Sequence, residues 1–269
     1  MTIDYASPGL FTQFDDDQLA VVHLLPSDPI ELCRAAQGLV VDINVVRGLP
    51  EGRFAERELR PAPELLRRVL ARNEAALDAP RANDDRVGGT CRHFAVLSVA
   101  FLRAHRIACR ARCGFASYFS PGAFVDHWIV EYHDGGRWVR VDAEILGLSI
   151  VAEPSDLRVG EFLTGGEAWT ACHDGSADAA RFGVAGVDHA WGIGEVRGNA
   201  IRDLAALNKL EMLPWDEWSR MEASYQGQSG PEFDALIDEI ARITAYDDPD
   251  ALQSLYEFED LAVPVDLLR

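Results

Sequence analysis

A stretch of helix-forming residues with apolar side chains on all faces follows directly after Gly88-Gly89-Thr90. Residues 91–103 hold apolar side chains at every angle around a helix and contain no helix breaker. Thr90 is a favourable N-cap residue, so we expect Cys91 to lie in the first turn of a helix that is buried on most sides.

A β-hairpin is predicted after this helix. Residues 126–132 and 137–142 are rich in aromatic and β-branched side chains, and Asp134-Gly135-Gly136 between them is typical of a turn. Antiparallel pairing brings the early part of the first arm close to the late part of the second. We therefore expect His127 and Asp142 to be neighbours.

Helices are predicted on both sides of this centre. Before it, one helix begins at Ser27-Asp28-Pro29, and a second covers residues 62–77 and leads into a polar loop at 78–85. After it, the pattern predicts strands within 106–150, helices at 155–163, 196–210, 231–244 and 249–257, an aromatic turn at 214–218 and a packing tail at 258–269.

These elements together predict an α+β fold in which the helix of Cys91 packs on an antiparallel sheet. The expected organisation is an N-terminal helical flank at 1–80, a catalytic core at 81–150 and a C-terminal helical extension at 151–269. We expect the extension to pack on the core, so that the chain forms one compact unit.

The three residues Cys91, His127 and Asp142 have the chemistry of a nucleophilic triad. The helix N-terminus is expected to lower the pKa of the Cys91 thiol, His127 to move its proton, and Asp142 to orient the imidazole. The alternative for Cys91 alone is a purely structural role, because free cysteine is among the most buried residue types.

The ordered motifs of residues 86–145 resemble those of the transglutaminase-like superfamily. The matching pieces are Gly89-Thr90-Cys91, Leu102-Arg103, Arg106 to Arg110 with Gly114, His127 to Glu131, and Trp138 to Asp142. The resemblance implies a papain-like fold and acyl transfer on amides, with Cys91 as nucleophile, His127 as general base and acid, and Asp142 as the orienting carboxylate.

The chain departs from the pattern of that superfamily at three places. Arg106 and Ala108 replace a glycine and a proline after the helix, and Ile129 stands where a tryptophan is common, with Trp128 one position earlier. The tissue-type transglutaminases also use a tryptophan upstream of the cysteine, and none precedes Cys91 here. A second oxyanion donor, beside the Cys91 backbone N–H, therefore stays unassigned.

A second set of the same residue types occurs later in the chain, at Cys172-His173-Asp174, His189 and Asp203. Cys172 follows no glycine pair and leads into a turn, and Gly192 and Gly194 interrupt any strand after His189. The sequence therefore favours the triad at Cys91.

The remaining cysteines are interpreted as structural. Cys109 and Cys113 lie on one predicted strand, too far apart for a disulfide, and the total of five cysteines is odd. With no hydrophobic N-terminal run, this indicates a reduced, cytoplasmic protein. A zinc site built from Cys109, Cys113, Cys172 and His173 is the weaker alternative, so we expect no metal and no cofactor.

Composition limits the partners. The chain has 269 residues, 48% hydrophobic content and a formal net charge of −19. Such a charge disfavours nucleic acid and anionic membranes as partners, and no apolar run is long enough to span a bilayer. An acidic surface favours solubility, with attraction of a cationic substrate or amine as the less favoured alternative. The sequence does not reveal the oligomeric state.

Substrate contacts are predicted next to the triad. The candidates are Gly89 and Thr90 beside the nucleophile, Tyr118, Phe119 and Phe124 in the loop before His127, and Trp128. The loop aromatics fit equally well a role in packing against the core. The polar residues between Glu195 and Asp203 are expected to form salt bridges that fix the C-terminal helices to the core.

Three classes of function remain open at this stage. The first is hydrolysis of a peptide or small-molecule amide by a cysteine amidase or peptidase. The second is an acyltransferase that passes a thioester-bound acyl group to an amine, for example in small-molecule or peptide biosynthesis. The third is a non-catalytic binding module, which the presence of all three triad residue types disfavours.

Overall fold

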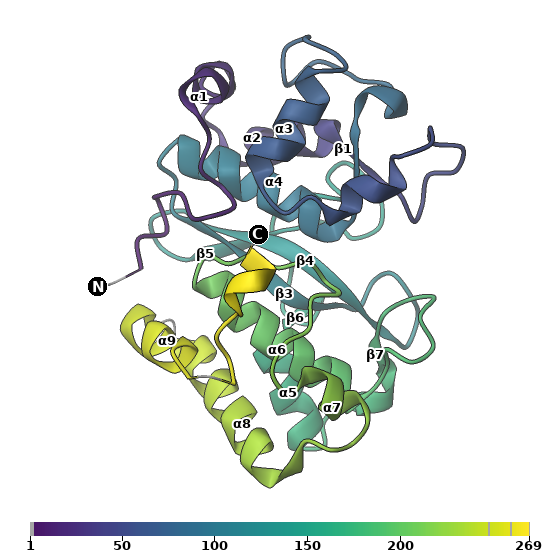
Figure 1. The fold of residues 1–269 in the computed structure, drawn as a ribbon, viewed down its shortest axis with the longest axis vertical. Helices are drawn as coiled ribbons and strands as arrows, with labels where there is room; N and C mark the ends of the chain where they lie inside the picture. The colour runs from purple at the N-terminus through teal and green to yellow at the C-terminus, as the bar shows by residue number, and fades with distance from the viewer. Residues whose placement is uncertain (1–2, 247, 259, 269) are drawn as a thin grey trace.

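A five-stranded sheet runs through the middle of the molecule (Figure 1). The computed structural model describes residues 3–246, 248–258 and 260–268. Four strands follow the order β5-β4-β3-β6 in antiparallel pairs, and β7 pairs in parallel with the beginning of β4. The strands are β3 (Cys109–Ala116), β4 (Phe124–His133), β5 (Trp138–Val141), β6 (Phe162–Thr164) and β7 (Phe182–Gly183).

Helices cover both sides of the sheet (Figure 1). The first group is α1 (Asp16–Val22), α2 (Pro29–Leu39), α3 (Ala62–Leu70) and α4 (Cys91–Ala104). The second group is α5 (Gly165–His173), α6 (Ile193–Leu207), α7 (Met221–Tyr225), α8 (Gly230–Tyr246) and α9 (Pro249–Tyr256). Short 3-10 helices are η1 (Phe54–Glu58), η2 (Asn83–Asp85), η3 (Ala179–Arg181) and η4 (Val265–Leu268).

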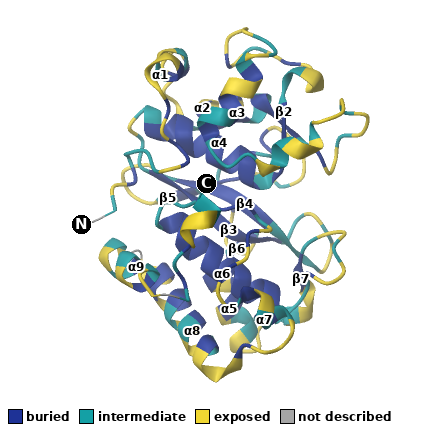
Figure 2. Ribbon diagram, viewed as in Figure 1, coloured by how far each residue is buried: buried dark blue, intermediate teal, exposed yellow. Residues whose placement is uncertain are grey.

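Helix α4 is buried over nearly its whole length, as the apolar side chains on all of its faces predict (Figure 2). It lies between α2 and α3 on one side and strands β3 and β4 on the other. Its two buried arginines join it to a distant segment. The Arg92 guanidinium donates to the backbone oxygen of Glu211, and Arg103 forms a 2.9 Å ion pair with the Glu211 carboxylate. The helix is therefore a fixed platform for Cys91.

A small parallel pair of strands leads into α4. Strand β1 (Val40–Asp42) pairs with β2 (Val87–Gly89), and this pairing sets Asp42 opposite Gly89. A side chain at Gly89 would lie only 2.7 Å from the His93 Cβ atom, so glycine is needed where the chain turns into the helix. The sequence pattern did not reveal this pair of strands.

The sheet is tightest where β3 passes β6. Gly114 pairs with His127 on one side and with Thr164 on the other. A Cβ atom at Gly114 would lie 2.0 Å from the Leu163 backbone oxygen, so no larger residue fits. This close pairing fixes the strand that is adjacent to His127.

The predicted α+β fold, with a buried helix packed on an antiparallel sheet and helices on both flanks, is confirmed. The predicted strand that holds Cys109 and Cys113 is β3, and both thiols are buried and free. The salt bridges expected between Glu195 and Asp203 are also confirmed, with Arg202 on Glu195, Arg112 on Asp203 and Arg197 on Asp234.

Two of the predicted helices are wrong in extent or type. Residues 155–163 form turns and the start of β6, because Gly160 has a φ of +86° and Phe162–Thr164 pair with β3. The helix predicted over 62–77 ends at Leu70, because the Asn73 side chain accepts the Ala75 N–H in a local turn.

One large hydrophobic core contains residues from Phe11 to Val263 and so draws on all three predicted parts of the chain. The boundaries at 80 and 150 stay a prediction. Within the described residues, the helices are all too short or too polar to cross a bilayer.

Candidate active site

Cys91 is the first residue of α4, as predicted, and its side chain is half-buried. Thr90 before it is extended, with a φ of −132°, and its backbone N–H donates to the His93 Nδ1 atom over 3.1 Å. The His93 backbone N–H donates in turn to the Thr90 carbonyl oxygen. These two local bonds hold the Cys91 backbone at the helix start.

His127 and Asp142 meet as the hairpin predicts. The β4–β5 pairing ends at Val130 and Val141, and the Asp142 side chain then reaches diagonally to His127. The His127 Nε2 atom lies 2.8 Å from an Asp142 carboxylate oxygen, and both residues are buried. The bond leaves Nδ1 as the ring nitrogen that can exchange a proton with another group.

Asp142 is held by three further contacts. Tyr118 donates its hydroxyl to the same carboxylate oxygen over 2.5 Å, and the Glu144 backbone N–H donates to the other oxygen over 3.0 Å. The Asp142 N–H donates to the Pro154 carbonyl oxygen over 2.9 Å. This carboxylate therefore keeps one position against the imidazole.

The cysteine and histidine are brought together with a third residue that the sequence did not indicate. The Cys91 sulfur, a ring nitrogen of His127 and a Glu144 carboxylate oxygen all lie within 4.8 Å of one another. Glu144 lies on the segment that carries Asp142, and its position two residues further on is the signal that could have found it.

The electrostatics of the thiol differ from the expectation. Burial raises the pKa of the Cys91 thiol well above its usual value, and the carboxyl groups of Asp126, Glu144 and Asp42 raise it further. A hydrogen bond from the Trp128 backbone N–H to the sulfur acts in the opposite direction. The direction is opposite to the predicted lowering, because burial and nearby carboxyl groups disfavour the thiolate.

Carboxyl groups around the thiol are themselves perturbed. Burial, Asp142 and Asp42 raise the pKa of Glu144 well above its usual value, and Asp42 also hydrogen-bonds its side chain. Burial and Glu195 raise the pKa of Asp126 to about 6. The surroundings of Cys91 thus hold several acidic groups whose ionised forms are disfavoured by burial and by one another.

The aromatic residues of the predicted substrate loop divide into two groups. The Phe119 ring lies edge-on to the His127 ring with centroids 4.9 Å apart, and the Tyr118 ring lies 6.2 Å from it. Phe119 is 38% exposed, so it forms part of the outer surface beside the imidazole. Phe124 instead stacks on Phe182 at 4.4 Å.

Trp128 does not reach this surface. It is 1% exposed and belongs to the main hydrophobic core, because successive strand residues point to opposite sides and His127 faces the site. Only its backbone N–H lies at the Cys91 sulfur. The predicted contact between the Trp128 ring and a substrate is excluded by this burial. Gly89 and Thr90 remain beside Cys91 on the backbone.

The later set of triad-type residues is not brought together. Cys172 lies near the end of α5, where burial raises the pKa of its thiol to about 11. His173 pairs with Asp238, and His189 is exposed in a turn. Among the described residues, the group of cysteine, histidine and carboxylate side chains with metal-ligand spacing is the one at Cys91, so the alternative zinc cluster of Cys109, Cys113, Cys172 and His173 does not form.

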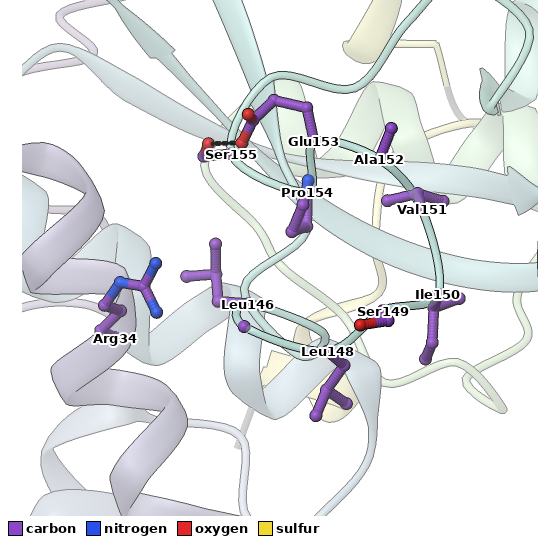
Figure 3. A pocket seen from close by; sticks show the side chains of 11 residues that line it. Arg34, Leu146, Leu148, Ser149, Ile150, Val151, Ala152, Glu153, Pro154 and Ser155 are labelled. Atoms are coloured by element: carbon purple, nitrogen blue, oxygen red, sulfur yellow. Dashed lines mark hydrogen bonds between the residues drawn. The ribbon is translucent and has the colours of Figure 1, made fainter.

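A cavity of about 600 Å³ lies along the loop that follows Asp142 and Glu144 (Figure 3). Residues 146–155 form most of its wall, and the Arg34 side chain of α2 lies across from them. Leu148 and Ile150 are exposed here. Cys91, His127, Asp142 and Glu144 are not among its lining residues, so this cavity is separate from the triad.

Comparisons with known proteins place the match in this same region. Residues 71–143 match the model of the transglutaminase-like superfamily. None of the curated proteins searched matches the chain. A solved structure of a candidate cysteine protease from Cytophaga hutchinsonii is similar at 18% identity and a TM-score of 0.38, over 60% of this chain and 44% of that one.

Proposed function

We propose, from the premise that residues 71–143 form a transglutaminase-like domain, that the protein is a cysteine-dependent acyl-transfer enzyme acting on amide bonds. Cys91 is the nucleophile, His127 the general base and acid, and Asp142 the orienting carboxylate. The observation that carries the proposal is the approach of the Cys91 sulfur and the His127 ring to within 4.8 Å, with Asp142 bonded to the other side of that ring.

The first half of the reaction forms a thioester. Because the pKa of Cys91 is raised, the nucleophile rests as the thiol, and His127 takes its proton as the sulfur attacks the amide carbonyl. The tetrahedral oxyanion is stabilised by the Cys91 backbone N–H. The C–N bond then breaks, His127 gives its proton to the leaving nitrogen, and the acyl group stays on sulfur.

The second half releases the acyl group. A water or an amine attacks the thioester, His127 takes a proton from that nucleophile, and the C–S bond breaks as His127 returns this proton to the leaving sulfur. Asp142 stabilises the imidazolium formed in both halves, and Tyr118 positions Asp142 through its hydroxyl.

Hydrolysis is the reaction we favour, because solvent water can reach a half-buried nucleophile such as Cys91. The leading assignment is therefore an amidase or peptidase. Transfer to an amine is the second candidate, and the acidic groups of Asp126 and Glu144 favour it because a cationic amine at this site would stabilise their ionised forms. The substrate in either case is a peptide or small-molecule amide.

The test uses the full chain with a library of peptide and small-molecule amides, and follows products by mass. Hydrolysis gives the free acid, and an added amine diverts the acyl group to a new amide if transfer operates. Cys91→Ala is the inactive control and Cys172→Ala the matched control that keeps activity. If the wild type turns over no compound of the library, the result favours a non-catalytic binding module. Turnover by Cys91→Ala would refute the assignment of Cys91 as the nucleophile.

A further inference from the structure

We propose that Cys91, His127 and Glu144 form a binding site for Zn²⁺, and that the metal-bound protein is a closed resting form that cannot accept an acyl group. The thiol sulfur, imidazole nitrogen and carboxylate oxygen lie within 4.8 Å of one another. Zinc bound by such ligands holds its donor atoms about 3.5 Å apart, so the three groups need to close by about 1 Å.

The side-chain movement that zinc binding needs is small, and the two half-buried ligands can make it. Cys91 and Glu144 are half-buried at the opening of the site, so rotation of their side chains brings the donor atoms together. His127 is buried and fixed by Asp142, and it provides the rigid centre of the site.

The contact between Asp142 and His127 suits a metal ligand. A histidine that binds zinc through one ring nitrogen commonly donates the other N–H to a carboxylate, which fixes the tautomer and raises the basicity of the ligand. Here Asp142 accepts from Nε2 over 2.8 Å, and Tyr118 and the Glu144 N–H fix Asp142 in turn. The Nδ1 lone pair is left for a metal on the side of Cys91.

The donor types indicate which metal ion fits the three groups. Sulfur and nitrogen donors select zinc over magnesium or calcium, which bind oxygen ligands.

Binding has a defined chemical consequence. Zn²⁺ displaces the Cys91 thiol proton to solvent and forms a bond to the sulfur. The same sulfur electron pair is then unavailable for attack on a carbonyl group. Metal and acyl donor therefore exclude each other, although metal binding itself does not require the proposed reaction to occur.

The test titrates chelator-treated full-length protein with Co²⁺ alone and then displaces it with Zn²⁺. We expect a thiolate-to-cobalt charge-transfer band at one equivalent, lost in Cys91→Ala and retained in Cys172→Ala. Competition with a chromophoric chelator should show Zn²⁺ affinity lowered by roughly 10–100-fold or more in Glu144→Gln. Glu144→Asp serves as the second variant if the amide disturbs folding.

Two results of the metal titration would contradict the proposed zinc site. A wild type without the band, or a band that survives in Cys91→Ala, would overturn the proposal. Unchanged affinity in Glu144→Gln and Glu144→Asp would remove Glu144 from the site and overturn the three-ligand arrangement. Acyl transfer is measured in the presence of a chelator, and metal binding is measured without substrate. A negative result for the zinc site therefore does not count against the proposed enzymatic function, and the reverse also holds.

Discussion

Strand β4 carries two clusters of buried charge that are built in opposite ways. Toward its end, Glu131 accepts from Arg110, Arg112 and Arg140 at 2.7, 2.9 and 3.0 Å, and these arginines hold its pKa well below the usual range. Toward its beginning, Asp126 lies beside the active histidine, and burial with Glu195 raises its pKa to about 6. One end of the strand has its charges compensated, and the other does not.

This difference indicates that the charged cluster at Glu131 stabilises the fold, whereas the acidic groups near Cys91 belong to the candidate active site. The compensated cluster ties β3, β4 and β5 to α6, because Arg112 also forms a bidentate pair with Asp203. Among the described residues, Asp126 and Glu144 form no ion pair with an arginine, and burial raises the pKa of both, which is common for carboxyl groups at functional sites. Substitutions at the two ends should therefore affect different measurements.

The largest effect is expected for Cys91→Ala. Removing the nucleophile should lower turnover of an amide substrate by about 10⁶-fold, by comparison with other triads. The urea midpoint should change little, because the side chain is small and half-buried. Steady-state kinetics and urea unfolding of the same preparation test both, and a wild-type rate would end the catalytic assignment.

Asp142→Asn should come next, with turnover reduced by roughly 10⁴-fold. An asparagine cannot supply the negative charge that stabilises the imidazolium. Tyr118→Phe removes only the contact that positions Asp142 and should cost far less. The order of these rates is the test, and Asp142→Asn at the wild-type rate would show that the carboxylate has no part in the reaction.

Glu131→Gln should act on stability instead of chemistry. Leaving three guanidinium groups without this buried carboxylate should cost about 3–5 kcal/mol in the free energy of unfolding. Because folding lowers this pKa, the contribution is present above the unfolded value of 4.5 and is lost as the pH falls through the lower folded value. Urea unfolding at several pH values measures it.

Glu167→Gln is the matched control for that variant. Glu167 pairs with Arg140 but is 42% exposed, so its loss should cost less than about 1 kcal/mol. Equal losses for the two variants would contradict the claim that compensation of buried charge holds this end of the sheet.

An effect of opposite sign is expected for Asp126→Asn. Folding raises this pKa from 3.8 to about 6, so the ionised carboxyl destabilises the fold above pH 6 and costs nothing below 3.8. The asparagine oxygen can still accept from Asn199, as Asp126 does over 2.7 Å. We expect a gain on the order of 1 kcal/mol at pH 8 and none at pH 3.5, measured by thermal unfolding. A loss at pH 8 would contradict the account.

Local patterns in the sequence were sufficient to predict the central elements. The apolar surface of α4 and the hairpin of β4 and β5 follow from side-chain periodicity and a glycine turn, and these elements place Cys91, His127 and Asp142. The N-cap at Thr90 and the start of α4 at Cys91 are local as well.

The features that were missed depend on contacts between distant segments. Strand β6 exists because residues 162–164 pair with β3, and β1 pairs with β2 across a wide gap in sequence. The raised pKa of the Cys91 thiol depends on Asp126, Glu144 and Asp42, which come from separate parts of the chain. No periodicity in the sequence encodes such a charge environment.

The most direct measurement is the mass of the protein after incubation with an amide substrate library and acid quenching, followed by peptide mapping. The account predicts an acyl adduct on Cys91, absent from Cys91→Ala and from the thiol of Cys172. An adduct confined to another residue, or efficient turnover with Cys91 unmodified and dispensable, would contradict it.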